Sequence, residues 1–110
     1  MITDATAEDL ATMAEQLGRP MRDVVGVAAR CVCGQPTVVA TKPRLADGTP
    51  FPTYYYLTHP QAAAAASRLE AAGRMADYAQ LLTGDTAAAY ARAHDAFLAD
   101  RLVHGDVPEI

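Results

Sequence analysis

Residues 24–41 read VVGVAARCVCGQPTVVAT, and the predicted sheet is built around this stretch. Its two ends, 24–30 and 37–41, are short and rich in β-branched residues, which is typical of strands. Between them lies CVCGQP, whose glycine and proline favour a turn. The stretch therefore predicts a β-hairpin that carries both cysteines of the chain, Cys31 and Cys33, in its turn.

The segments on either side of the hairpin predict one more strand and four helices. Residues 53–57, TYYYL, are aromatic and predict a third strand. The apolar spacing and the end signals predict helices over 6–17, 61–72, 75–82 and 86–103. The order α-β-β-β-α-α-α indicates an α+β domain, in which a small three-stranded antiparallel sheet is covered by about four helices.

The first helix has readable ends and one apolar face. Thr6 is its predicted N-cap, because a hydroxyl can accept a hydrogen bond from an amide of the first turn. Gly18 is its predicted stop. Leu10, Met13 and Leu17 follow helical spacing, so we expect them to face the sheet.

The composition bounds the class of protein. The 110 residues predict a single domain over 1–110, and the 24 alanines with only two phenylalanines and no tryptophan predict a modest core. The net charge of −4 argues against a nucleic-acid partner. No apolar run approaches the roughly 20 residues of a membrane span, and no signal peptide is readable. We therefore expect a cytoplasmic protein with no membrane partner.

The Cys-x-Cys-Gly turn is the sharpest local signal for a metal. Alternate residues of an extended chain face one side, so Cys31 and Cys33 can converge on one ion. Gly34 permits a left-handed turn, in which backbone amides can donate to the sulfurs. In a reducing compartment we expect thiols or metal ligands rather than a disulfide. The alternative is that both are small buried apolar residues.

His59 is the third candidate ligand. Pro60 is predicted at the first position of the second helix, which makes Thr58 or His59 its cap. An imidazole there could join Cys31 and Cys33 in a site for Zn²⁺, or less readily for an iron–sulfur cluster, although zinc prefers four ligands. The alternative reading of His59 is a helix cap or a surface histidine.

A cluster of basic residues predicts an anion site. Five of the nine basic residues lie between positions 19 and 44, namely Arg19, Arg22, Arg30, Lys42 and Arg44. We expect Arg30, Lys42 and Arg44 to bind a phosphate or carboxylate of a small molecule, with Cys31 or Cys33 as a possible nucleophile. The alternative is a solvated basic face.

Strand direction predicts that these two signals meet. If the first and third strands both pair antiparallel with the second, they end at the same edge of the sheet. We therefore expect one cleft lined by Arg30, Cys31, Cys33, Arg44 and His59.

The remaining polar and aromatic signals are weaker. His94 lies on an apolar stripe of the last helix, so we expect it to be in the core or semi-buried, and we expect His104 in an exposed tail. Of the three tyrosines in 54–56, we expect one in the core and its neighbours at the rim. No phosphate-binding glycine loop and no complete catalytic set is readable, so an enzyme is less favoured. A third hypothesis is therefore a non-catalytic domain that binds a protein through an alanine-rich helix face.

Several runs of the chain resemble one bacterial family, called domain of unknown function 501. They are QLGRP at 16–20, RCVCG at 30–34, PRLADGTPFPT at 43–53, YLT at 56–58 and RLEAAG at 68–73. The resemblance extends from about residue 11 to the end of the chain, and it implies no established activity. The gene neighbourhoods of the family imply a link to cell division or phosphate metabolism.

The resemblance also bears on the metal hypothesis. The family has cysteine at the position of His59, and both residue types bind zinc. It also implies a further Cys-Leu-His segment beyond the region matching 107–110, which could supply a fourth ligand; this chain stops before that segment, as a truncated form or a short member would.

Overall fold

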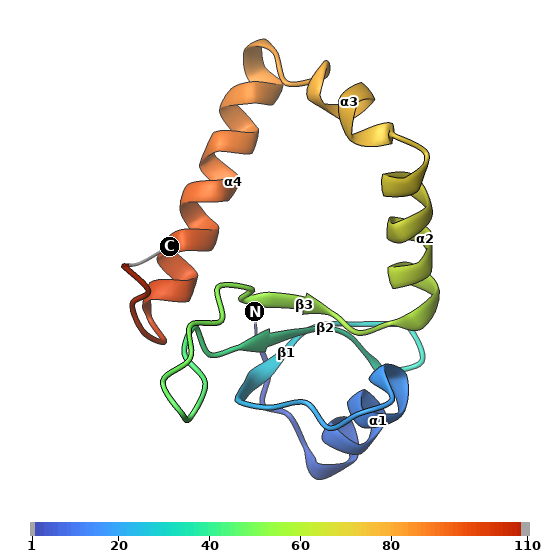
Figure 1. The fold of residues 1–110 in the computed structure, drawn as a ribbon, viewed down its shortest axis with the longest axis vertical. Helices are drawn as coiled ribbons and strands as arrows, with labels where there is room; N and C mark the ends of the chain where they lie inside the picture. The colour runs from blue at the N-terminus through green and yellow to red at the C-terminus, as the bar shows by residue number, and fades with distance from the viewer. Residues whose placement is uncertain (1, 109–110) are drawn as a thin grey trace.

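The computed structural model describes residues 2–108, and within them it has a three-stranded antiparallel sheet and four α-helices in the predicted order (Figure 1). The elements are α1 (Ala7–Leu17), β1 (Val24–Arg30), β2 (Pro36–Thr41), β3 (Tyr55–Leu57), α2 (Pro60–Ala71), α3 (Arg74–Ala79) and α4 (Gly84–Leu102). The predicted α+β class is confirmed.

The hairpin and the third strand pair as the sequence predicts. In the antiparallel β1–β2 pair Val27 lies opposite Val39, and in the β2–β3 pair Val39 lies opposite Tyr56. β1 and β3 therefore run in the same direction and end at the same edge of the sheet. β3 is shorter than predicted, because only residues from 55 onward join the ladder.

α1 covers one face of the sheet. Its start is a capping box, in which the Thr6 hydroxyl accepts a hydrogen bond from the Asp9 N–H and the Asp9 carboxylate accepts one from the Thr6 N–H. Met13 is fully buried against Val27 and Val39. The prediction for Leu10 is wrong, because this side chain is 42% exposed.

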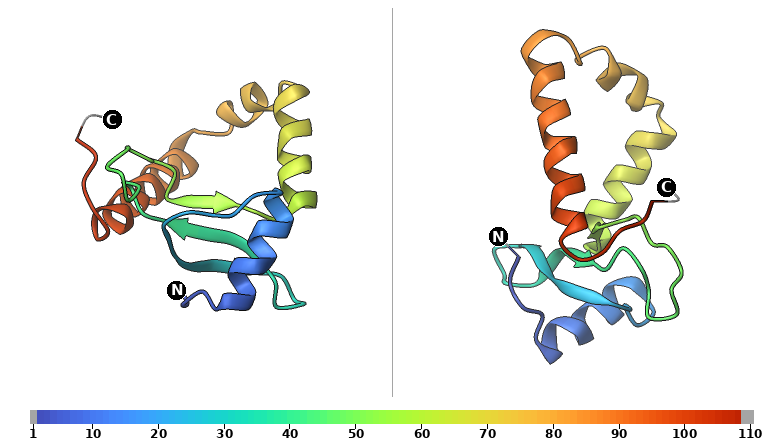
Figure 2. Two further views of the ribbon diagram at one scale, coloured as in Figure 1. Left: turned by 60° about the horizontal axis from the view of Figure 1, so that its bottom comes forward. Right: turned by 90° about the vertical axis from the view of Figure 1, so that its left-hand side faces the viewer.

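The residues of α2, α3 and α4, together with their connections, form an arch over 60–102 that we call the arm (Figure 1). The arm leaves the sheet after β3 and returns to it only at the end of α4, and the further views agree (Figure 2). None of its residues is buried. We expected about four helices to cover the sheet. Of the described helices, only α1 covers a face of it, and α4 reaches the sheet only at its end (Figure 1).

The alanine content explains why the arm builds no core of its own. Sixteen of the 24 alanines of the chain lie within 60–102. An alanine side chain removes little apolar area from water when it packs, so these helices have a weak driving force toward the sheet. The prediction that His94 is semi-buried is wrong for the same reason, because α4 is exposed at that position.

Candidate functional site

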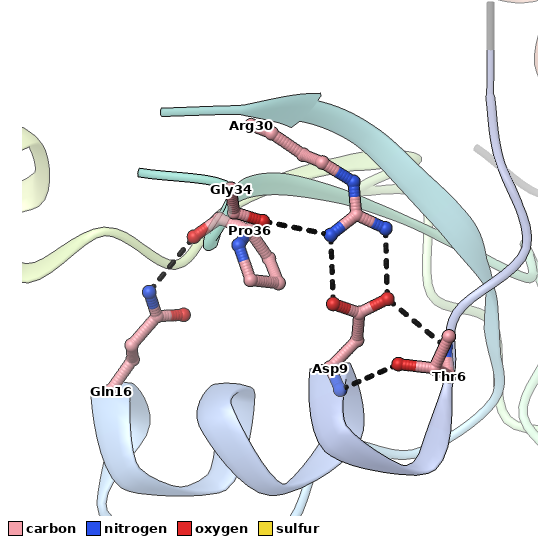
Figure 3. A network of polar contacts seen from close by, with 6 residues as sticks. All are labelled: Thr6, Asp9, Gln16, Arg30, Gly34 and Pro36. Atoms are coloured by element: carbon pink, nitrogen blue, oxygen red, sulfur yellow. Dashed lines mark hydrogen bonds and ion pairs between the residues drawn. The ribbon is translucent and has the colours of Figure 1, made fainter. Parts of the chain in front are cut away.

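The hairpin turn is joined to α1 by an ion pair between Arg30 and Asp9 (Figure 3). The guanidinium donates two hydrogen bonds to the carboxylate, Nη1 to Oδ1 and Nη2 to Oδ2, each 2.8 Å long. Nη1 also donates to the carbonyl oxygen of Gly34 at 3.0 Å. Arg30 thus links the first turn of α1 to Gly34 in the hairpin turn.

The same contacts fix the charge state of Asp9. The hydrogen bond from Arg30 and the one from the Thr6 N–H hold the pKa of the Asp9 carboxyl well below its usual range, while burial opposes them. The hydrogen bond to Asp9 raises the pKa of Arg30. The positive charge of Arg30 is therefore already matched by a carboxylate within the chain, which weakens its predicted role as an anion ligand.

Cys31 and Cys33 form a disulfide rather than the predicted free thiols. The turn causes this pairing: the Gly34 N–H donates to the Cys31 carbonyl oxygen at 2.9 Å, and the chain doubles back between the cysteines. The Cys33 N–H donates to the Cys31 Sγ at 3.1 Å. Gly34 has a φ of 90°, which confirms the predicted left-handed turn. The predicted hydrogen bond from a backbone amide to a cysteine sulfur is also present.

A hollow of about 410 Å³ lies beside the disulfide. Polar side chains of α1, among them Glu8 and Asp9, form one wall, and the turn with Arg30 and Cys33 forms the other. Cys33 borders this hollow and is exposed, whereas Cys31 is half-buried. The hollow is open to solvent and polar, so it suits a small polar group better than an apolar ligand.

His59 lies at the same edge of the sheet but is not brought into a metal site. Its N–H donates to the Thr37 carbonyl oxygen at 3.4 Å, and its Nδ1 accepts a hydrogen bond from the Ala62 N–H at 3.3 Å. His59 is thus the N-cap of α2, one of the two residues predicted for that role. Over residues 2–108, no three histidine, cysteine or acidic side chains are grouped so that they could hold a metal ion. The predicted set of Cys31, Cys33 and His59 is therefore not assembled.

Lys42 and Arg44 lie at the opposite end of the sheet from Arg30. In the antiparallel hairpin, Arg30 pairs with Pro36, whereas Thr41 pairs with Val24 at the start of β1. Lys42 follows the far end of β2, so it lies away from the cysteine turn that Arg30 borders. Arg44 donates to the carbonyl oxygens of Gly48 and Asp106. The structure therefore does not bring Arg30 together with Lys42 and Arg44, as the predicted anion site and the predicted shared cleft both require.

A second hollow, of about 570 Å³, lies on the sheet face that α1 leaves uncovered. Val27 and Val39 face α1, so their neighbours Ala28 and Val38 face this hollow, which Tyr54, Tyr55 and the end of α4 also line. We call it the sheet groove. Apart from Asp100 and His104 at its α4 side, its lining is mainly apolar.

Aromatic contacts attach the end of α4 to the sheet groove. The Tyr54 ring lies 6.1 Å from that of Phe97 and is stacked on the His104 ring at 5.5 Å. The Tyr55 hydroxyl donates to Asp100 at 3.1 Å, and burial together with this carboxylate raises the pKa of Tyr55. The prediction for the tyrosines is confirmed, because Tyr54 is 1% exposed and its neighbours lie at the rim. The contribution of Asp100 and His104 was missed, since only contacts distant in sequence reveal it.

A family model described as "Protein of unknown function (DUF501)" matches residues 27–106, which include nearly all of the hairpin, the disulfide and the whole arm. The chain belongs to the DUF501 family. The resemblance noted from sequence is thereby confirmed, although α1 and the run at 16–20 precede the matched residues. No curated protein and no solved structure matches the chain. Within residues 2–108, no helix has both the length and the hydropathy to cross a bilayer.

The most extensive unexplained surface of this DUF501 protein is on the arm. Over 60–102 eight large apolar side chains are exposed: Leu69, Met75, Tyr78, Leu81, Leu82, Tyr90, Leu98 and Leu102. Leu81 is 64% exposed, Tyr90 63% and Met75 62%. Scattered single apolar residues are common on protein surfaces, but a whole helical segment that exposes its large apolar side chains is typical of an interaction surface.

Proposed function

We propose that this DUF501 protein is a non-catalytic protein-interaction domain and that the arm is its binding surface. The observation that carries the proposal is that residues 60–102 bury none of their side chains while exposing eight large apolar ones. Covering such side chains releases about 25 cal/mol for each Å² of apolar area removed from water. A protein partner therefore gains free energy by docking on the arm.

The lengths of the helices support the same conclusion. α2 has 12 residues and α3 has 6, and isolated helices shorter than about 12–15 residues are marginally stable in water. Helices of this kind in proteins depend on packing of an apolar face. Because neither α2 nor α3 buries a residue within its own chain, a partner that covers them also stabilises these helices.

The occupant that the molecule favours is a second copy of this chain. The arm carries four arginines and five carboxylates, so two arms meet with little net repulsion, and a strongly charged partner is disfavoured. The sheet groove is a second uncovered apolar surface on the same molecule. In a two-fold dimer each arm can cover the sheet groove of the other copy, which satisfies both surfaces at once.

Sedimentation of the full chain over a range of concentrations tests this proposal. We expect a concentration-dependent dimer, and we expect Leu81→Glu to shift the population to monomer because it places a charge on the interface. Leu10→Glu is the matched control, since Leu10 is also exposed but lies on α1, outside the arm. A wild-type chain that stays monomeric while its arm amides are strongly protected from hydrogen exchange would contradict the proposal.

A further inference from the structure

We propose that the Cys31–Cys33 disulfide is a thiol–disulfide exchange site whose substrates are neutral or cationic thiols. This inference does not depend on the arm or on a dimer, because it rests on the hairpin turn alone. The turn presents the two sulfurs unequally, and a polar hollow lies beside the more exposed one.

Accessibility selects Cys33 as the sulfur that is attacked. Cys33 is exposed and borders the hollow of about 410 Å³, whereas Cys31 is half-buried. Val32 between them is fully exposed, so the turn projects into solvent. An incoming thiolate must approach along the line of the sulfur–sulfur bond, and the open side of that bond is the side of Cys33.

A hydrogen bond selects Cys31 as the leaving group. The Cys33 N–H donates to the Cys31 Sγ at 3.1 Å, and an amide donor stabilises a thiolate more than a neutral sulfur. A better stabilised leaving thiolate departs faster. Arg30 also donates to the Gly34 carbonyl oxygen at 3.0 Å, and this contact holds the turn in place after the disulfide opens.

The reaction balances with two thiols as the co-reactant. A thiolate R–S⁻ attacks the Cys33 Sγ, a new sulfur–sulfur bond forms, and the electron pair of the broken bond leaves on the Cys31 Sγ. A second thiolate then attacks the R sulfur of this mixed disulfide, which releases R–S–S–R and the Cys33 thiolate. The protein disulfide gains two electrons, and the two protons lost by the thiols pass to the cysteines or to solvent.

The charges around the hollow define the class of thiol. Asp9 and Arg30 form an ion pair, so their charges offset each other. Glu8 also lines the hollow and gives it a net negative charge. A thiol that carries an amine is therefore attracted, and a thiol that carries a sulfonate or carboxylate is repelled, most strongly at low ionic strength.

The test mixes the oxidised full chain with cysteamine or with 2-mercaptoethanesulfonate at equal thiolate concentration, quenches with N-ethylmaleimide and maps the products by mass spectrometry. We expect the mixed disulfide on Cys33 and the maleimide on Cys31. At low salt we expect cysteamine to react about fivefold faster than the sulfonate, and Glu8→Gln to reduce this preference. Val32→Ala is the matched control, because it changes the same turn without touching a sulfur or a charge, and it should react like wild type.

A second measurement distinguishes protein thiols from small-molecule thiols as the substrate. A short lysine-rich peptide with one cysteine reacts faster than cysteamine if the hollow receives protein thiols, and no faster if it receives small ones. A mixed disulfide mainly on Cys31, two free thiols in protein purified without reductant, or a disulfide that persists with every thiol would overturn the exchange site. Equal rates with the cationic and the anionic thiol would overturn the assignment of substrate class.

Discussion

The two halves of this molecule handle apolar surface in opposite ways. The base, residues 2–58, contains the fully buried side chains of Met13, Val39 and Tyr54, whereas the arm contains none. The base has a capping box that begins its helix and an ion pair that joins this helix to the hairpin, and the arm meets the sheet only through the end of α4. Local sequence preference can therefore specify helices such as α2 and α3 even though they bury no residue within their own chain.

The largest expected effect comes from emptying the core of the base. Met13→Ala removes a side chain that is fully buried against Val27 and Val39, and such substitutions cost about 2–5 kcal/mol of unfolding free energy. Urea denaturation followed by circular dichroism measures the loss. Met75→Ala is the matched change in the arm, and because Met75 is 62% exposed, the monomer should lose far less stability. Similar losses for both variants would mean that Met75 is as well packed in the monomer as Met13.

The next effect concerns the ion pair between α1 and the hairpin. Asp9→Asn removes the charge that Arg30 binds, and a hydrogen bond to a charged group contributes about 1.5–3 kcal/mol. Because the folded pKa of Asp9 is depressed, its contribution is present above the unfolded pKa and is lost as the pH falls through and below that value. The gap in urea midpoint between wild type and Asp9→Asn should therefore narrow steadily as the pH falls toward 2. A gap that stays constant would show that the carboxylate charge contributes nothing.

A smaller effect separates two helix caps. The Thr6 hydroxyl accepts a hydrogen bond from the Asp9 N–H, whereas Thr83, the N-cap of α4, makes no side-chain capping bond. Thr6→Ala should cost about 1 kcal/mol, the usual value for a lost cap, and Thr83→Ala should cost little. The two variants differ in position but remove the same atoms, so each serves as the control for the other. Equal losses would mean that α4 depends on its cap as much as α1 does.

The parts of the fold that were predictable are those set by neighbouring residues. Thr6, Gly18 and Pro60 mark helix ends through their own backbone and side-chain chemistry, and the β-branched residues of the hairpin indicate its two strands. The edge shared by the ends of β1 and β3 also follows from strand order alone. These inferences needed no knowledge of distant contacts.

The candidate site was less predictable because its members are chosen by contacts between distant segments. Asp9 is buried in place of Leu10 because Arg30, 21 residues away, binds its carboxylate. Lys42 lies far from Arg30 because the six residues of β2 separate it from the turn, a separation that closeness in sequence to the basic cluster does not reveal. Asp100 joins the sheet groove through Tyr55, 45 residues away, and nothing near either residue indicates the pair.

The smallest expected effect on the stability of the monomer is that of Leu81 in the arm. Leu81→Ala removes apolar area that is 64% exposed, so in dilute solution its unfolding free energy should differ from wild type by less than about 0.5 kcal/mol. If a second copy covers the arm, the same substitution becomes destabilising as the protein concentration rises, because wild type then gains stability from association and the variant does not. Melting temperatures measured over a wide concentration range check this, with Leu10→Ala as the exposed leucine of the base. Parallel concentration dependence for the three proteins would mean that Leu81 is simply a solvated side chain and that the arm is stable without a partner.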